Sequence, residues 1–259
     1  MASVLEISSS SNKRFKSLCA LLTSRGIDEQ GSFLVSGAKL LRECSDDPIL
    51  AQRAQALIGT RAQLEDWQEY LPELARISLT SELFRGLDSA GTNKPLLQMS
   101  ARSLVKIEDF ENFEESYPGA TLVVPFQNPE NVGAIIRTAA ALGVDRVLLT
   151  EESANPFLPK AIRAGGLSIF RLSVFKGPKL ADLIACKTNI FALDASGNPL
   201  EKVHFPRTFL LLCGIEGPGL KHISNDKIQF MGIPMHNSTE SLNAATAAAI
   251  ALYVWKRSL

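Results

Sequence analysis

The first hundred residues combine one clear helical repeat with several short apolar runs. In the segment 13–23, which follows a serine-rich stretch, apolar residues recur at i, i+3, i+4 and i+7, so we predict an amphipathic helix. Those apolar residues are Phe15, Leu18, Cys19 and Leu22. The apolar run 33–35 predicts a short strand, and a second helix follows Gly37. Further apolar runs at 54–59, 77–79 and 96–99 suggest other short elements. This pattern indicates a small α/β unit without a catalytic cluster.

In the second half, short apolar strands alternate with helices. Strands are predicted at 122–124, 147–149, 170–174, 190–193, 209–212 and 229–233. One helix is expected over 134–142, ended by Gly143, and a long alanine-rich helix over 241–255. Alternation of this kind is typical of a parallel sheet covered by helices on both faces. The fold class predicted for this half is therefore α/β.

Between 107 and 119 the chain becomes acidic and loses its periodicity, ending in Pro118-Gly119. A run of this composition is typical of a solvated connector. We therefore predict a first domain at 1–105, a linker at 106–119 and a second domain at 120–259.

Charge and cysteine content narrow the classes of function. The chain has 27 Lys and Arg residues and 27 Asp and Glu residues, so a nucleic-acid partner would require basic residues gathered on one face. The four cysteines are scattered and no histidine lies at ligand spacing, so we expect neither a metal site nor disulfides. No apolar stretch is long enough to cross a bilayer, and no leader pattern opens the chain, so we expect a cytoplasmic protein without a membrane partner.

Three segments of the second half place glycines and polar residues at strand ends, where ligands bind in open α/β sheets. In the first segment, Asn128-Pro129 is a good helix start, and Asn131 and Arg137 follow on the same helix. Arg137 stands between Ile136 and Thr138, in a stretch whose neighbours are expected to be buried. A charge in such surroundings needs a partner, for which a phosphate is suited; the simpler interpretation is a capped helix with a surface arginine.

The second and third segments follow later strands. Residues 214–219, Gly-Ile-Glu-Gly-Pro-Gly, come directly after an apolar strand and match neither the dinucleotide fingerprint nor a P-loop; alone, they would be a tight turn. Residues 233–245 lead from a strand end through a polar loop into a helix start. A capped helix explains one or two of its polar residues, but not all four, which are Asn237, Ser238, Ser241 and Asn243.

Taken in order, these segments resemble the three signature motifs of the SpoU (TrmH-like) family of SPOUT RNA 2′-O-ribose methyltransferases. The matching pieces are Asn131 with Arg137-Thr138-Ala139, the stretch 214–219, and Ile233-Pro234-Met235 with Ser241-Leu242-Asn243. The stretch 155–163 is also similar to the loop between the first two motifs. The first half resembles, more loosely, the L30e-like RNA substrate-binding domain of family members. It departs from the family at Ser36 and at 92–95, which bears on the RNA target.

The resemblance implies a deep trefoil knot in the second domain, S-adenosylmethionine as cofactor, structured RNA as substrate (ribosomal before transfer RNA), and a homodimer formed through the second domain. It implies cofactor contacts from Leu193, Gly214, Glu216, Gly217, Ile233, Met235, Ser241 and Leu242. It implies catalytic roles for Arg137, Asn131, Glu216, Ser241 and Asn243. Because an arginine stays protonated, Arg137 is expected to bind phosphate or stabilise the developing alkoxide instead of acting as a base.

Two other classes of protein compete with this interpretation. A catalytically silent RNA-binding relative would keep the fold but would not need all five polar motif residues. A nucleotide-dependent oxidoreductase would need the dinucleotide fingerprint, which the chain lacks. Among the three histidines, only His236 lies close enough to a motif to be considered for the site.

Overall fold

The structure is a computed structural model, and it describes residues 4–107, 110, 113–215, 220, 228–236 and 241–258. Its contacts divide the chain into two compact units. Unit 1 comprises Met1–Ser103 together with Asn155–Leu167, and unit 2 comprises Leu104–Ala154 and Ser168–Leu259. The segment 155–167, which lies in the second half of the sequence, therefore packs as part of unit 1.

Unit 1 is built on a five-stranded mixed sheet in the order β1-β4-β3-β5-β2. The strands are β1 (Val4–Ile7), β2 (Ser32–Ser36), β3 (Ala54–Gly59), β4 (Ala75–Leu79) and β5 (Leu96–Ser100). β4 pairs in parallel with β1 and β3, whereas β5 runs antiparallel to both β3 and β2. The four short apolar runs of the first half are therefore all strands.

Unit 1 also contains six short helices: α1 (Lys13–Ala20), α2 (Ser24–Gln30), α3 (Ala38–Asp46), α4 (Pro48–Ala51), α5 (Arg61–Asp66) and α6 (Ser81–Leu87). In five of them the side chain of Asn12, Thr23, Asp47, Thr60 or Thr80 accepts hydrogen bonds from first-turn N–H groups. Such caps satisfy donors that have no partner inside the helix. Polar residues therefore define where these five helices begin, whereas α3 follows Gly37 without a side-chain cap.

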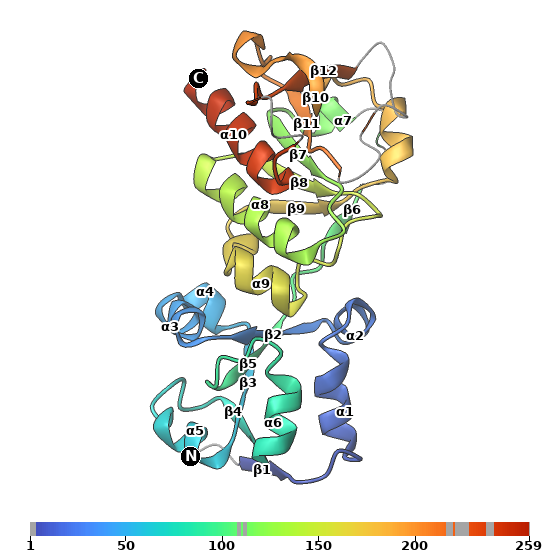
Figure 1. Ribbon diagram of the computed structural model, residues 1–259. Helices are drawn as coiled ribbons and strands as arrows, with labels where there is room; N and C mark the ends of the chain where they lie inside the picture. Colours follow the sequence, from blue (N-terminus) through green and yellow to red (C-terminus); the bar gives the residue numbers. More distant parts are fainter. Residues whose placement is uncertain are drawn as a thin grey trace. The chain divides into compact units, whose positions relative to one another are not determined.

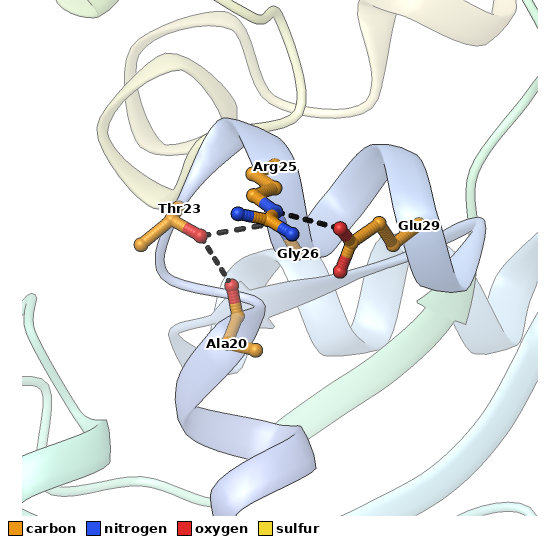
Figure 2. A network of polar contacts seen from close by, with 5 residues as sticks. All are labelled: Ala20, Thr23, Arg25, Gly26 and Glu29. Carbon is orange, nitrogen blue, oxygen red and sulfur yellow. Dashed lines mark hydrogen bonds and ion pairs between the residues drawn. The ribbon is translucent and has the colours of Figure 1, made fainter.

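The close approach of α1 and α2 requires a glycine in the first turn of α2 (Figure 2). Thr23 Oγ1 donates to the carbonyl of Ala20 at 2.8 Å and accepts from the N–H of Gly26 at 3.2 Å, while Arg25 pairs with Glu29 at 2.6 Å. A Cβ added at Gly26 would lie 2.1 Å from the carbonyl oxygen of Ala20. The two helices approach so closely that only a hydrogen fits at this position.

The segment 155–167 contains α9 (Pro159–Gly165), which packs on β2. The rings of Phe157 and Phe33 lie 5.0 Å apart, and Asn155 Nδ2 donates to Asp28 Oδ1 at 3.0 Å. These contacts bury an apolar side of the segment within unit 1. Periodicity along the chain did not predict that a segment from the second half of the sequence packs within unit 1.

Unit 2 is built on a seven-stranded sheet in the order β12-β10-β11-β7-β8-β9-β6, and every recorded pair is parallel. The strands are β6 (Val105–Lys106), β7 (Ala120–Val124), β8 (Arg146–Leu149), β9 (Ser173–Lys176), β10 (Ile190–Pro199), β11 (Phe209–Leu212) and β12 (Ile228–Gly232). The predicted parallel α/β sheet is thus confirmed. The strand expected at 170–174 starts later, because Ser168–Phe170 forms a 3-10 turn, η1, and β9 begins at Ser173.

Two long helices, α8 (Pro129–Leu142) and α10 (Ala244–Arg257), pack against each other along the sheet of unit 2 (Figure 1). α8 begins as predicted, with Asn128 as its cap and Pro129 in its first turn, and Gly143 ends it in a left-handed conformation. The ring of Phe209 on β11 meets Trp255 of α10. Its neighbour Leu210 belongs to another apolar cluster, which includes Phe113 of α7 (Phe113–Ser116) and Leu183 of η2 (Leu180–Ala185). Successive side chains of one strand therefore serve two apolar layers.

Candidate functional site

A cavity of about 570 Å³ lies in unit 2 where β10, β11 and β12 meet the start of α10. Its lining includes six residues that the sequence assigned to a cofactor: Leu193, Gly214, Ile233, Met235, Ser241 and Leu242. Asn243 and Ala244, at the start of α10, complete that side. In a parallel sheet the carboxyl ends of the strands share one edge, so loops distant in sequence converge there. Its volume is typical of a site for a small organic ligand.

Three glycines bring backbone segments close together at the cavity or next to it. A Cβ at Gly214, which lines the cavity, would lie 2.9 Å from the carbonyl oxygen of Leu193. A Cβ at Gly232, also in the lining, would lie 3.0 to 3.2 Å from the carbonyl oxygens of Asp194, Ala195 and Gly197. At Gly197 an added Cβ would lie 2.4 Å from the amide nitrogen of Met231. Glycine at these positions therefore allows β10, β12 and the loop after β11 to approach one another closely.

A bulge in β10 forms part of this wall. The pairing of β10 with β12 shifts between Leu193 and Asn198, because both residues face Met231. The four residues between them, 194–197, leave the strand register, and Asp194, Ala195 and Ser196 line the cavity. Bulges of this kind commonly re-aim side chains next to functional sites. The strand predicted from the sequence ends at Leu193 and does not include this loop, although Ser196-Gly197-Asn198 is a turn-forming combination.

Two asparagines from the first and third segments meet beside the cavity. Asn243 Nδ2 donates to Asn131 Oδ1 at 3.0 Å. Asn243 Oδ1 accepts from the N–H groups of Ala245 at 3.0 Å and Thr246 at 3.2 Å, so the same amide caps α10. Asn131 is only 8% exposed. This amide pair joins two helices whose bonded residues stand 112 positions apart.

Arg137 lies on α8, two turns after Asn131. Its neighbours Ile135 and Ile136 are buried as expected, but Arg137 itself is exposed. A helix directs adjacent side chains to different sides, so Arg137 can face solvent although Ile135 and Ile136 are buried. The guanidinium therefore does not need a buried partner. An exposed guanidinium can meet a large ligand such as a phosphate backbone.

The structure also bears on a cysteine nucleophile, a histidine in the site, metal binding and membrane spans. Burial raises the pKa of the Cys213 thiol, which keeps it neutral and makes a nucleophilic role for it unfavourable. His236 is exposed and is not among the residues that line the cavity. Across the described residues, no three side chains of the His, Cys, Asp and Glu types are grouped as metal ligands. None of the helices in the described ranges has the length and apolar character needed to span a membrane.

Four residues singled out in the second and third motifs lie outside the described residues. They are Glu216 and Gly217 of the second motif and the polar residues Asn237 and Ser238 of the third. The described part of the site therefore rests on Gly214 and Ile215 for the second motif. For the third motif it rests on Ile233, Met235 and the stretch 241–243.

A parallel sheet with a glycine-containing cavity at the carboxyl ends of three strands is typical of α/β proteins that bind nucleotide-like cofactors. The model of the SpoU rRNA Methylase family matches residues 120–253. A relative named Ribosomal RNA small subunit methyltransferase G 2, from Syntrophobacter fumaroxidans, is 41% identical over 256 residues, which is 98% of this chain. This chain spans 49% of that relative's length.

Two further matches extend over nearly the whole length of both compared chains. The 23S rRNA (guanosine(2553)-2'-O)-methyltransferase RlmP of Bacillus subtilis is 26% identical over 257 residues, covering 96% of this chain and 98% of the relative. The SpoU methyltransferase AviRb of Streptomyces viridochromogenes, solved with the cofactor AdoMet, is 26% identical with a TM-score of 0.69. That comparison covers 95% of this chain and 97% of the solved chain.

The chain belongs to the SpoU rRNA Methylase family. It is an RNA methyltransferase whose cofactor is S-adenosylmethionine (AdoMet). The described cavity fits this group, since a wall without side chains at Gly214 and Gly232 admits an adenosine close to backbone donors and acceptors. The resemblance noted in the sequence is thereby confirmed.

Proposed function

We propose that this chain transfers a methyl group from S-adenosylmethionine to a ribose 2′-hydroxyl of ribosomal RNA. One observation supports this most strongly: the cavity assigned to the cofactor lies directly beside the Asn131–Asn243 pair. Asn243 belongs to both features, because it lines the cavity and holds Asn131. A methyl donor and the polar groups that orient an alcohol would therefore occupy one site.

When bound, S-adenosylmethionine would supply a methyl group on a positively charged sulfur, and the neutral thioether S-adenosylhomocysteine would be the leaving group. The ribose oxygen would form the new O–C bond as the S–C bond breaks, the electron pair of the broken bond would stay on sulfur, and the hydroxyl proton would pass to solvent water. The chain must then hold the alcohol in line with the methyl group, and such alignment can supply much of the rate. Backbone groups around Gly214 and Ile233 would fix the donor, while the Asn131–Asn243 pair would orient the ribose side.

Arg137 would act on the substrate from its exposed position on α8. An arginine remains protonated, so it binds a phosphate or stabilises negative charge on the attacking oxygen, and it does not accept the proton. Ser241, which lines the cavity, would orient the ribose, and Glu216 would organise the loop after β11.

Ribosomal RNA is favoured over transfer RNA as substrate by the names of the relatives. The Bacillus subtilis relative, matched over nearly its whole length, is named as a 23S rRNA 2′-O-methyltransferase. The relative with a small-subunit name is matched over only about half its length, so we give its name less weight for this chain. The cell compartment proposed for this chemistry is the cytoplasm.

The substrate can be tested by mapping 2′-O-methyl sites in total RNA from cells with and without the gene. We expect one ribosomal position to lose its methyl group when the gene is absent, and the purified protein to restore it with S-adenosylmethionine. Loss of a transfer-RNA position would refute the ribosomal assignment. An unchanged map, together with no methyl transfer by the purified protein, would refute the enzymatic function.

Three finer features of the family are also proposed for this chain. The first is a trefoil knot in unit 2, supported by the parallel order β12-β10-β11-β7 and by the packing of α10 on α8. The second is an RNA-binding role for the domain at 1–105, with an L30e-like fold. The third is a homodimer through the second domain, at 120–259, supported by Tyr253, which is 54% exposed on α10.

Sedimentation of the full chain tests the dimer. We expect two copies per particle, and we expect Tyr253→Glu to dissociate them because a charge would be buried at the interface. A full chain that sediments as a monomer at micromolar concentration would overturn the dimer proposal.

A further inference from the structure

The bulge in β10 places one ionisable side chain at the cofactor cavity. Among the described residues that line the cavity, Asp194 alone is charged; the others are apolar, glycine, or neutral and polar. Asp194 is partly buried at the end of the buried run Ile190 to Leu193. A carboxylate at a partly enclosed cavity exerts a stronger field than one in open water.

The carboxylate is held in place by its own loop. Asp194 Oδ1 accepts hydrogen bonds from the backbone N–H of Ser196 at 2.9 Å and from the Ser196 hydroxyl at 2.6 Å. The residues on either side of this loop, Leu193 and Asn198, both pair with Met231 of β12. The loop is thus anchored to β12 at both ends, and the carboxylate cannot turn away without breaking its bonds to Ser196.

This charge meets a cofactor whose own charge changes during the reaction. The donor S-adenosylmethionine carries a positive sulfur, and its product, S-adenosylhomocysteine, carries a neutral one. The adenosine, the amino group and the carboxylate are the same in both molecules. A nearby carboxylate therefore attracts the donor more than the product, whereas contacts to the shared parts cannot distinguish them.

We propose that Asp194 is a specificity residue that makes the cavity prefer the positively charged methyl donor over the neutral product. This inference rests on the proposed cofactor site. Loss of the positive charge in the methyl-transfer step would remove the attraction to Asp194, so the same residue would favour release of the product. Its effect should appear in the ratio of two affinities, and not in the affinity for adenosine-containing ligands as such.

The test is calorimetric titration of the full chain with S-adenosylmethionine, S-adenosylhomocysteine and sinefungin, whose amine carries a positive charge near the sulfur position. Asp194→Asn is the main variant, because an amide oxygen can still accept from Ser196. We expect it to lower the preference for S-adenosylmethionine over S-adenosylhomocysteine about tenfold, or ~1.4 kcal/mol. Affinity for sinefungin should fall in parallel with that for S-adenosylmethionine.

Two controls separate charge from loop structure. Asp194→Glu keeps the charge and should retain most of the preference. Ser196→Ala removes the 2.6 Å contact of the hydroxyl, but the backbone N–H of residue 196 can still hold the carboxylate, so affinity for both ligands should change by the same factor. The melting temperature of each variant checks that unit 2 remains folded.

An equal loss of affinity for both ligands in Asp194→Asn, or no loss for either, would overturn the proposal. The first result would assign Asp194 to the shared adenosine or amino-acid part, and the second would place its charge out of range. If the wild-type chain bound neither ligand, the proposed cofactor site itself would fail, which is a distinguishable result.

Discussion

The two units use different sheets, and the difference explains where the chemistry lies. In unit 1, β5 runs opposite to both of its neighbours, so its carboxyl end points away from those of β3 and β2. In unit 2 every recorded pair is parallel, so the carboxyl ends of β10, β11 and β12 share one edge. That edge carries the cofactor cavity. Convergence of several loops is what a parallel arrangement offers a binding site.

The two units also use glycine for different purposes. Gly26 in unit 1 lets two helices meet, and its neighbours form a local network of caps and an ion pair (Figure 2). Gly214 in unit 2 lets the loop after β11 approach the carbonyl of Leu193 at the cavity wall. A substitution at the first should therefore affect stability, and one at the second should affect cofactor binding.

The largest effect is expected for Gly214→Val. The added side chain would meet the Leu193 carbonyl and distort the cavity wall, so affinity for S-adenosylmethionine should fall by more than about a thousandfold, or ~4 kcal/mol. Calorimetric titration measures this loss. Gly86→Val is the matched control, since nothing lies within 4 Å of a Cβ at Gly86 of α6. Near-normal affinity in Gly214→Val would place the cofactor elsewhere.

Arg137→Ala should cut single-turnover methyl transfer by about a hundredfold to a thousandfold, the range seen when one transition-state donor is removed. Affinity for the cofactor should stay nearly unchanged, because Arg137 is not among the residues that line the cavity. Arg137→Lys should recover only part of the rate, since lysine lacks the planar fork. Arg61→Ala, on an exposed helix of unit 1, is the control. A normal rate in Arg137→Ala would remove Arg137 from the catalytic group.

Gly26→Ala tests the structural glycine of unit 1. A methyl group 2.1 Å from a backbone oxygen forces α1 and α2 apart, so we expect a loss of about 3 kcal/mol in the free energy of unfolding. Thermal denaturation should show the loss while cofactor affinity at low temperature is kept. Gly86→Ala should be neutral or slightly stabilising. Loss of cofactor binding in the folded Gly26→Ala variant would contradict the division of roles between the units.

The smallest effect is expected at the basic residues of unit 1. Lys13 and Lys16 are exposed on α1, so replacing both with alanine should weaken RNA binding about tenfold and reduce its salt slope by about 2. Arg25, which is also basic, is paired with Glu29 at 2.6 Å, so Arg25→Ala should change affinity less. Filter binding at several salt concentrations measures both. We also propose RNA contacts for Arg14, Lys39, Lys160 and Arg163 of unit 1 and, separately, for Arg171 of unit 2. Salt-independent binding would argue against an electrostatic RNA surface.

Removing residues 1–105 would disturb unit 1 and also expose a segment from the second half of the sequence. A fragment that starts at 106 keeps the segment 155–167 but lacks β2, on which α9 packs. Phe157, Ala161 and Ile162, all buried in the full chain, would lose much of their cover. Tests of dimer formation are therefore better made on the full chain than on that fragment.

Local pattern alone determined much of this protein. The runs 54–59 and 209–212 are β3 and β11 residue for residue, and α8 starts at Asn128-Pro129 and ends at Gly143 as predicted. Strand alternation, caps and terminal glycines are encoded within a few residues, so they can be seen in one sequence. Ordered motifs also sufficed to indicate the family and six of the cavity residues.

Tertiary structure decided what depends on residues far apart. The bond between Asn131 and Asn243 spans 112 positions, and the bulge at 194–197 arises from how β10 pairs with β12. The placement of 155–167 in unit 1 depends on contacts between distant residues, such as Phe157 and Phe33. No local repeat in the sequence predicts such a contact. Exposure of Arg137 follows from its direction on a helix packed against α10. Periodicity indicates which face of one helix or strand is buried. Which residues that face contacts is determined by strand pairing and by packing between elements.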